Sequence, residues 1–257
     1  MKPRFFLLIL LLAALPLFNF IDRTHSVETG VVTNPNNLNP EEEGLADSKT
    51  ILVDYLQELY HTSGADIQGL KYDVLKKAIT GFYNIKKEHK INKNILTVID
   101  YSLPSIKERL WIIDLDNKKV LFHSLVAHGK NSGENLAVNF SNSTNSHMSS
   151  LGFYRTKGIY FGKHGKSLII EGLDKEYNAN AEARYVVVHG ADYVSKEFVD
   201  CNGRLGRSHG CPAIPKDLTE AIISTIKDGT VMFSYHPKYK SQHYMDENAA
   251  SDAIGRK

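Results

Sequence analysis

The stretch of residues 185–212, YVVVHGADYVSKEFVDCNGRLGRSHGCP, joins a β-rich run to a glycine-rich segment that contains a cysteine. Tyr185 to His189 is a short apolar run that ends in a histidine, which predicts a buried strand. Tyr193 to Val199 predicts a short helix. The segment that follows sets His209 and Cys211 among glycines, a composition that suits a reactive site.

Ser208-His209-Gly210-Cys211-Pro212 is the part of this stretch that indicates catalysis. Glycines beside a cysteine let backbone N–H groups approach a reacting carbonyl group without a Cβ in the way. The pattern therefore makes Cys211 a candidate nucleophile, with N–H groups near Gly210 and Cys211 as oxyanion donors. A tight structural turn before a helix is the alternative.

A nucleophilic cysteine needs a base, because an unperturbed thiol has a pKa of about 8.5. Four His-Gly dipeptides are available, beginning at His128, His164, His189 and His209. His189 is the preferred base because it ends a rigid apolar strand upstream of Cys211. His209 is the weaker candidate, because we expect its ring to point away from the thiol.

Short β-rich runs continue outward from this stretch and predict a mainly β (α+β) domain. They are Leu96–Tyr101, Leu110–Leu115, Val120–Ala127, Gly158–Gly162, Leu168–Gly172 and Val231–Tyr235. Asp116-Asn117-Lys118 supplies hairpin-turn residues, so the runs on either side are expected to pair antiparallel. Lys216 to Lys227 has one apolar face and predicts a helix that stops before Gly229.

Two amphipathic helices are expected before the β-rich region. Ser48 to His61 has apolar residues at three- and four-residue spacing, with Ser48 as the candidate N-cap, and Leu70 to Lys90 repeats the pattern. The expected organisation is a signal peptide or N-terminal anchor at 1–20, a linker at 21–47, a helical extension at 48–94, a catalytic domain at 95–237 and a frayed polar tail at 238–257.

The N-terminal residues predict export. Lys2 and Arg4 precede an apolar run from Phe5 to Phe18, which is the order found in a secretory signal. The run is shorter than the roughly 20 residues that cross a bilayer, so a cleaved signal is favoured over a permanent span. An uncleaved anchor stays open because no A-x-A site follows. We expect a periplasmic or cell-envelope location, with membrane contact only through this segment.

Charge and cysteine content narrow the class of protein. The 31 Lys plus Arg against 29 Asp plus Glu leave a formal charge of +2, which argues against a nucleic-acid partner. Cys201 and Cys211 are too few for a disulfide-stapled scaffold. A bridge between them would remove the nucleophile, and it is the structural alternative to catalysis.

His189-Gly190, a gap of about twenty residues and then Ser208-His209-Gly210-Cys211 resemble the signature of the L,D-transpeptidase (YkuD-type) catalytic domain. Five further segments look like the murein branch in which Pro-Ala follows the cysteine: Asp114-Leu115, Val126–Lys130, Phe140–Asn142, Ser149–Tyr154 and Arg184–Gly190. The resemblance runs from about Leu96 to His236. It implies a YkuD-like β-sandwich or barrel with an N-terminal helical extension.

The resemblance also implies roles for individual residues. Cys211 would be the nucleophile and His189 the base, while Ser208, His209 and Gly210 would shape the pocket. The better-known branch has an arginine two residues after the cysteine, and here that position is Ala213. Gly190 and three arginines are therefore the candidates for substrate binding: Arg184, Arg204 and Arg207. No cofactor and no metal is implied.

Acyl transfer on peptidoglycan stem tetrapeptides is the reaction that the resemblance implies. The thiolate would displace the terminal D-alanine and leave a thioester, which an amine of a second stem or of an acceptor protein would then take up. Water as acceptor would make an L,D-carboxypeptidase. The alternatives are a non-catalytic peptidoglycan-binding module and a zinc site with His189, His209 and a cysteine, although no H-E-x-x-H motif is present.

Overall fold

The computed structural model describes residues 40–256, and the side chains from residue 50 onward. The expected signal segment and residues 21–39 of the expected linker lie outside this range. Within the described residues, no helix is both long enough and apolar enough to span a membrane.

Eight strands form one mixed sheet in the order β3-β2-β1-β8-β4-β5-β6-β7. Their bounds are β1 Ile95–Asp100, β2 Leu110–Asp114, β3 Lys119–Ser124, β4 Gly152–Gly162, β5 Gly165–Gly172, β6 Val187–Ala191, β7 Ala213–Pro215 and β8 Val231–Tyr235. Two pairs are parallel, β1 with β8 and β6 with β7, and the others are antiparallel. The hairpin expected around Asp116-Asn117-Lys118 is confirmed by the antiparallel pairing of β2 with β3.

The two edges of this sheet approach each other, which makes the fold a nearly closed barrel. After edge strand β3 the chain reaches Ala127, which forms a bridge to Ala213 of the opposite edge strand β7, and Gly129 forms a second bridge to Ser208. The amide nitrogens of Ala127 and Lys130 donate to the carbonyl oxygens of Ala213 and Ser208, each at 2.8 Å. The expected mainly β, barrel-like fold is confirmed.

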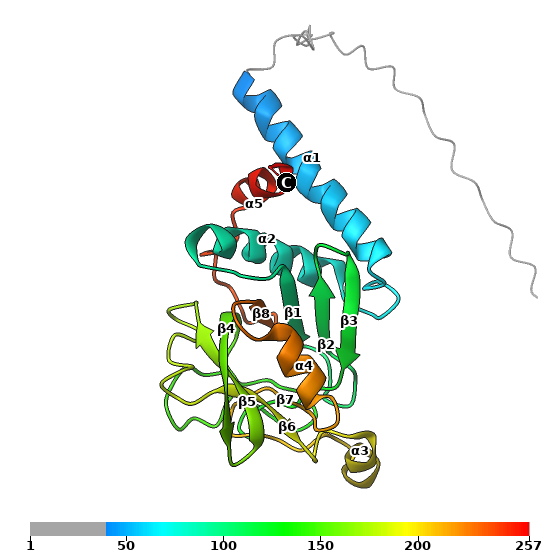
Figure 1. Cartoon of the computed structure of the whole chain (residues 1–257), viewed down its shortest axis with the longest axis vertical. Helices are drawn as coiled ribbons and strands as arrows, with labels where there is room; N and C mark the ends of the chain where they lie inside the picture. The colour runs from blue at the N-terminus through cyan, green and yellow to red at the C-terminus, as the bar shows by residue number, and fades with distance from the viewer. Residues whose placement is uncertain (1–39, 257) are drawn as a thin grey trace, which may run out of the picture. The chain divides into compact units, whose positions relative to one another are not determined.

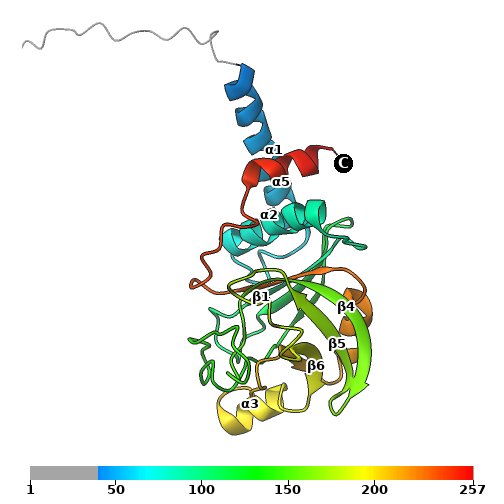
Figure 2. The same ribbon diagram turned by 90° about the vertical axis from the view of Figure 1, so that its left-hand side faces the viewer.

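Three helices gather at one end of the sheet (Figures 1 and 2). They are α1 (Pro40–Thr62), α2 (Tyr72–Glu88) and α5 (Glu247–Gly255). The apolar face of α2 belongs to the same buried core as β1 and β8. Contact there is close, because a Cβ on Gly81 would lie 2.0 Å from the Phe153 ring. The helical extension therefore shares its core with the sheet.

Helix bounds at both ends of the chain differ from the sequence-based expectation. Helix α1 begins at Pro40, so residues 40–47 are helical and Ser48 lies inside the helix instead of capping it. The polar tail forms α5, where Asp246 caps the helix by accepting from Ala249 N and where Ala250 is buried. Asn84 of α2 donates to the carbonyl oxygens of Tyr244 and Asp246, and this tertiary contact overrides the polar composition.

The elements around the cysteine turn are short. Helix α3 (Lys196–Asn202) and helix α4 (Thr219–Ile226) confirm the two expected helices with shifted bounds. Strand β6 begins two residues later than expected, which places His189 within the strand and not at its end. Strand β7 has three residues, too few for a sequence pattern to reveal.

Candidate active site

Cys211 lies in the turn immediately before β7, where its side chain is half-buried. Its Sγ atom accepts a hydrogen bond from the backbone N–H of Val187 on β6, with 3.5 Å between nitrogen and sulfur. The thiol in turn faces the carbonyl oxygen of Tyr185 at 3.7 Å. The sulfur is thus held against the start of the strand that carries His189.

Ser208 and Ser149 hold the backbone of the cysteine turn from two sides. Ser208 Oγ donates to Cys211 O at 2.6 Å and accepts from Gly210 N at 3.0 Å. Ser149 Oγ donates to Gly210 O at 3.2 Å and accepts from Gly129 N at 3.0 Å. The N–H of Gly210 is therefore already bonded, so it is not the free oxyanion donor that the sequence suggested.

Gly210 occupies a position that requires glycine. Its φ angle is +125°, and a Cβ there would lie 2.8 Å from Met148 O. Gly129 packs against it so closely that a Cβ on Gly129 would lie 2.9 Å from the Gly210 Cα. The glycines of two of the four His-Gly dipeptides are therefore required by close backbone packing around the cysteine turn.

His189 lies in β6 directly opposite Ala213 of β7 and is 2% exposed. Its Nδ1 atom is 3.0 Å from the carbonyl oxygen of Gly190. Because a carbonyl oxygen only accepts, the neutral ring carries its proton on Nδ1 and leaves the Nε2 lone pair available. Burial lowers the pKa of His189, and electrostatic interaction with His164 and Lys163 lowers it further, while the bond to Gly190 opposes these effects.

Cys211 and His189 line the same cleft, which has a volume of about 370 Å³. Among the described residues, no hydrogen bond joins the two side chains. Burial raises the pKa of the Cys211 thiol, while the Val187 N–H and the positive charges of Arg184 and Lys163 oppose this increase. Both shifts favour a neutral thiol beside a neutral imidazole in the unliganded protein.

Arg184 is the arginine that the structure places closest to the chemistry of the cleft. Its guanidinium donates to the carbonyl oxygens of Ser141 and Met148, each at 2.8 Å, and to Ser146 Oγ at 3.1 Å. These bonds fix a positive charge that lowers the pKa of the Cys211 thiol. Arg184 thus supplies a cation that Ala213, two residues after the cysteine, does not.

Two other candidate arginines are bound to the same carboxylate. Arg207 lines the cleft but pairs with Glu134 at 2.6 Å, and Arg204 pairs with Glu134 at 2.8 Å. Arg204 does not line the cleft, and neither does Gly190. A Cβ on Gly190 would lie 2.0 Å from Thr219 Oγ1 of α4, so this glycine serves helix packing and offers its carbonyl oxygen to His189.

His209 is among the residues that line the cleft. Its exposed ring stacks on His147, with ring centroids 4.4 Å apart and an interplanar angle of 20°. Cys201 is exposed on α3, and both cysteines are free thiols. The disulfide alternative is therefore absent from this structure.

Two residues that line the cleft and one that binds the cysteine turn were not assigned a role by sequence reasoning. Lys163 and His164 come from the turn between β4 and β5, and Ser149 comes from a loop far upstream of Cys211. His164 was visible only as one of four His-Gly dipeptides. No local signal distinguishes it, because its contact with His189 depends on how the β4–β5 hairpin folds.

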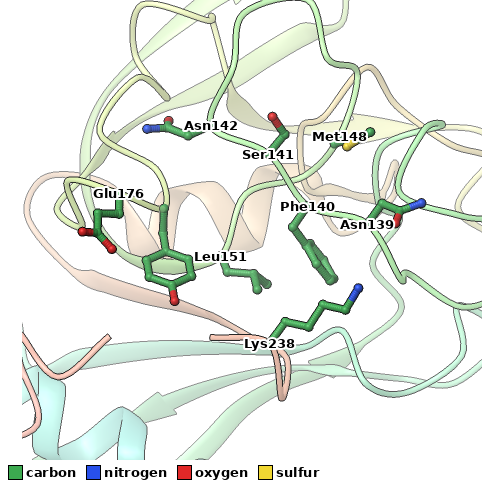
Figure 3. A pocket seen from close by; sticks show the side chains of 9 residues that line it. Asn139, Phe140, Ser141, Asn142, Met148, Leu151, Glu176 and Lys238 are labelled. Atoms are coloured by element: carbon green, nitrogen blue, oxygen red, sulfur yellow. The ribbon is translucent and has the colours of Figure 1, made fainter. Parts of the chain in front are cut away.

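A second cavity of about 470 Å³ lies beyond the segment that Arg184 holds. Figure 3 shows Glu176 and Lys238 on different sides of this cavity, with Phe140 and Leu151 between them. It is larger than the cleft but contains neither Cys211 nor His189, so it is not the reaction centre. Among the side chains of residues 50–256, no group of three or more His, Cys, Asp or Glu is close enough to hold a metal ion.

Residues 66–235 match the L,D-transpeptidase catalytic domain family (YkuD_2). Similar solved structures include an L,D-transpeptidase from Mycobacterium smegmatis, with 13% identity over 56% of this chain and 59% of that chain and a TM-score of 0.35. An L,D-transpeptidase from Mycobacterium tuberculosis H37Rv has 12% identity over 57% of this chain and 60% of that chain, with a TM-score of 0.35. One from Stackebrandtia nassauensis has 12% identity over 74% of this chain and 89% of that chain, with a TM-score of 0.34. The match spans about three fifths of the first two structures. No curated protein matches the chain. The family match covers well over half of the sequence, and the chain belongs to the L,D-transpeptidase catalytic domain family.

Proposed function

We propose that this protein is a peptidoglycan L,D-transpeptidase with Cys211 as nucleophile and His189 as general base. The observation that carries the proposal is that both side chains line one cleft, with the sulfur bonded to the N–H of Val187 on the histidine's own strand. Catalytic hydrogen bonds are often longer in unliganded enzymes and tighten when the substrate binds. Nε2 of His189 has its lone pair available for that step.

The first half-reaction is acylation of the sulfur. His189 Nε2 takes the thiol proton as sulfur attacks the carbonyl carbon of the amide before the terminal D-alanine. The carbon–nitrogen bond then breaks, the imidazolium returns its proton to the departing amine, and D-alanine leaves a thioester behind. The N–H of Cys211, which lies against its own sulfur, is the oxyanion donor that the turn offers, a contribution of about 3 kcal/mol in comparable sites.

The charge of the cleft supports an anionic acyl donor such as a stem peptide. Lys163, Arg184 and Arg207 line it, and no carboxylate stands among the lining residues that the structure describes. Glu134 offsets Arg207, which leaves Lys163 and Arg184 to face the substrate's carboxylates. The second half-reaction transfers the acyl group to an amine, from a second stem or a protein lysine, and to water in the carboxypeptidase variant.

The test is incubation with purified peptidoglycan fragments, followed by mass analysis of the products. Loss of one D-alanine with a new amide supports transpeptidation, and loss of D-alanine alone supports the carboxypeptidase reaction. Cys211→Ala should abolish both while leaving the circular dichroism spectrum unchanged. Unaltered fragments with folded wild-type protein would favour a non-catalytic binding module.

We also propose that the protein works in the periplasm or cell envelope, which rests on Lys2, Arg4 and the apolar run after them. Cell fractionation of the full chain tests this location. The N-terminal sequence of the recovered protein distinguishes a cleaved signal from a retained anchor. Recovery of the protein only from the cytoplasmic fraction would contradict the proposal.

A further inference from the structure

The hairpin of β4 and β5 ends in a two-residue turn that lies beside the catalytic base. Gly162 pairs with Gly165 across the hairpin, so Lys163 and His164 form the turn itself. Ser167 of β5 pairs directly with His189 of β6. The hairpin is a long curved ribbon next to β6 (Figure 2). This arrangement brings a residue of the turn onto the base.

The His164 ring stacks on the His189 ring, with centroids 4.4 Å apart and an interplanar angle of 24°. His164 is itself exposed, whereas His189 is only 2% exposed. The hairpin ring therefore covers a face of the base that would otherwise meet the solvent of the cleft. At the edge of the His189 ring, Nδ1 is held by the carbonyl oxygen of Gly190.

We propose that His164 is a positioning residue for His189: its ring holds the imidazole in the orientation in which Nδ1 bonds Gly190 and Nε2 remains available to the thiol. The inference rests on the proposed function in taking His189 as the base. A ring held between a hydrogen bond on its edge and a stacked ring on its face has little freedom to rotate, and such support is what an active-site base requires.

His164 also affects the pKa of His189. Burial is the largest cause of the lowered pKa of His189, and electrostatic interaction with the titratable neighbours His164 and Lys163 lowers it further. Removal of the His164 ring should therefore raise this pKa, because it both admits water and removes a like charge. The other titratable or charged groups lining the cleft are Tyr160, Arg184, Tyr185, Tyr193, Arg207, His209 and Cys211.

The first experiment measures the base directly and needs no substrate. Histidine is labelled with ¹⁵N, the His189 ring signals are assigned by comparison with His189→Gln, and their titration is followed in wild type and His164→Ala. We expect a higher pKa for His189 in the variant and a mixture of ring tautomers. His147→Ala is the matched control, because it removes an imidazole that stacks on His209 and not on the base.

The second experiment follows D-alanine release against pH. In His164→Ala we expect kcat to fall about tenfold with KM changed less than about twofold, and the acidic limb of the profile to move to higher pH. His164→Phe keeps a ring over His189 and should retain most of kcat. An unchanged His189 titration in His164→Ala would overturn the proposal, and so would equal losses of kcat in the Ala and Phe variants.

The two experiments separate the positioning role from the proposed function. If wild type releases no D-alanine but His164→Ala still shifts the His189 titration, the proposed reaction fails and the physical link between the two rings stands. If wild type is active and the titration does not move, His164 is only a surface residue of the hairpin.

Discussion

Ser149 Oγ donates a hydrogen bond to the carbonyl oxygen of Gly210, the residue that precedes the nucleophile. The same oxygen accepts from Gly129 N, so one buried side chain ties two loops to the cysteine turn. Ser149→Ala leaves one buried carbonyl and one buried N–H unpaired, at about 1–3 kcal/mol each. We expect a lower free energy of unfolding in urea and a lower kcat. Thr144→Ala, in the exposed part of the same loop, is the control and should change neither.

Arg184 should act on the thiol through its fixed charge. Because the guanidinium lowers the pKa of Cys211, Arg184→Ala should slow alkylation of Cys211 by iodoacetamide at pH 8. The same change frees the carbonyl oxygens of Ser141 and Met148, and kcat/KM should fall tenfold or more, about 1.4 kcal/mol of transition-state stabilisation.

Two further variants test the Arg184 prediction: one keeps the charge at residue 184, and the other removes a different arginine. Arg184→Lys keeps the charge without the planar set of donors, so its alkylation rate should be closer to the wild-type value than its kcat/KM. Arg204→Ala removes an arginine that pairs with Glu134 outside the cleft and should have a much smaller effect on alkylation. Equal effects of Arg184→Ala and Arg204→Ala would mean that only overall charge matters.

The pH dependence of alkylation reports which protonation state the free enzyme holds. Burial raises the pKa of Cys211 and lowers that of His189, so a thiolate–imidazolium pair is disfavoured before substrate binds. In a Cys201→Ser background, the alkylation rate should rise with an inflection above the value of about 8.5 for an ordinary thiol. An inflection well below neutral pH would show a preformed ion pair instead.

His128 should make stability depend on pH. It is 1% exposed, its Nδ1 accepts from Arg109 Nη2 at 2.8 Å, and burial with the Arg109 charge lowers its pKa to about 4. The unfolded chain binds this proton near pH 6.5, so full stability is present above that pH. Stability then falls between about pH 6.5 and 4, by roughly 3 kcal/mol at most.

His128→Gln isolates the contribution of this histidine from that of the carboxylates. The amide can still accept from Arg109 and donate to Gly133 O, but it does not titrate. Urea unfolding at pH 7 and pH 5 should show a smaller loss for the variant than for wild type. Identical losses would mean that His128 is not the residue responsible.

Short-range sequence patterns predicted the strands and turns whose formation depends mainly on neighbouring residues. Strand β8 matches its predicted bounds of Val231–Tyr235, and the Asp116-Asn117-Lys118 turn forms the expected hairpin. Helix α5 was missed because its burial depends on partners about 160 residues away, including Asn84. Polar composition alone cannot reveal such a contact.

The candidate site likewise has residues that the local sequence predicted and residues that only the tertiary structure revealed. Glycines and histidines close to Cys211 in the sequence marked the cleft, and the apolar run before His189 marked the strand that carries the base. His164 and Ser149 reach the site through the β4–β5 hairpin and through a loop next to Gly210, so their roles depend on tertiary packing. The choice of Arg184 among three arginines likewise needed the positions of the carbonyl oxygens that it binds.

Intact-protein mass spectrometry after mixing with a stem tetrapeptide tests the central claim most directly. We predict an adduct of the tetrapeptide less D-alanine that maps to the peptide containing Cys211 and is lost on treatment with hydroxylamine, as expected of a thioester. The adduct should be absent from Cys211→Ala and should form much more slowly in His189→Gln. Full D-alanine release by Cys211→Ala, or an adduct on Cys201 instead, would contradict the account.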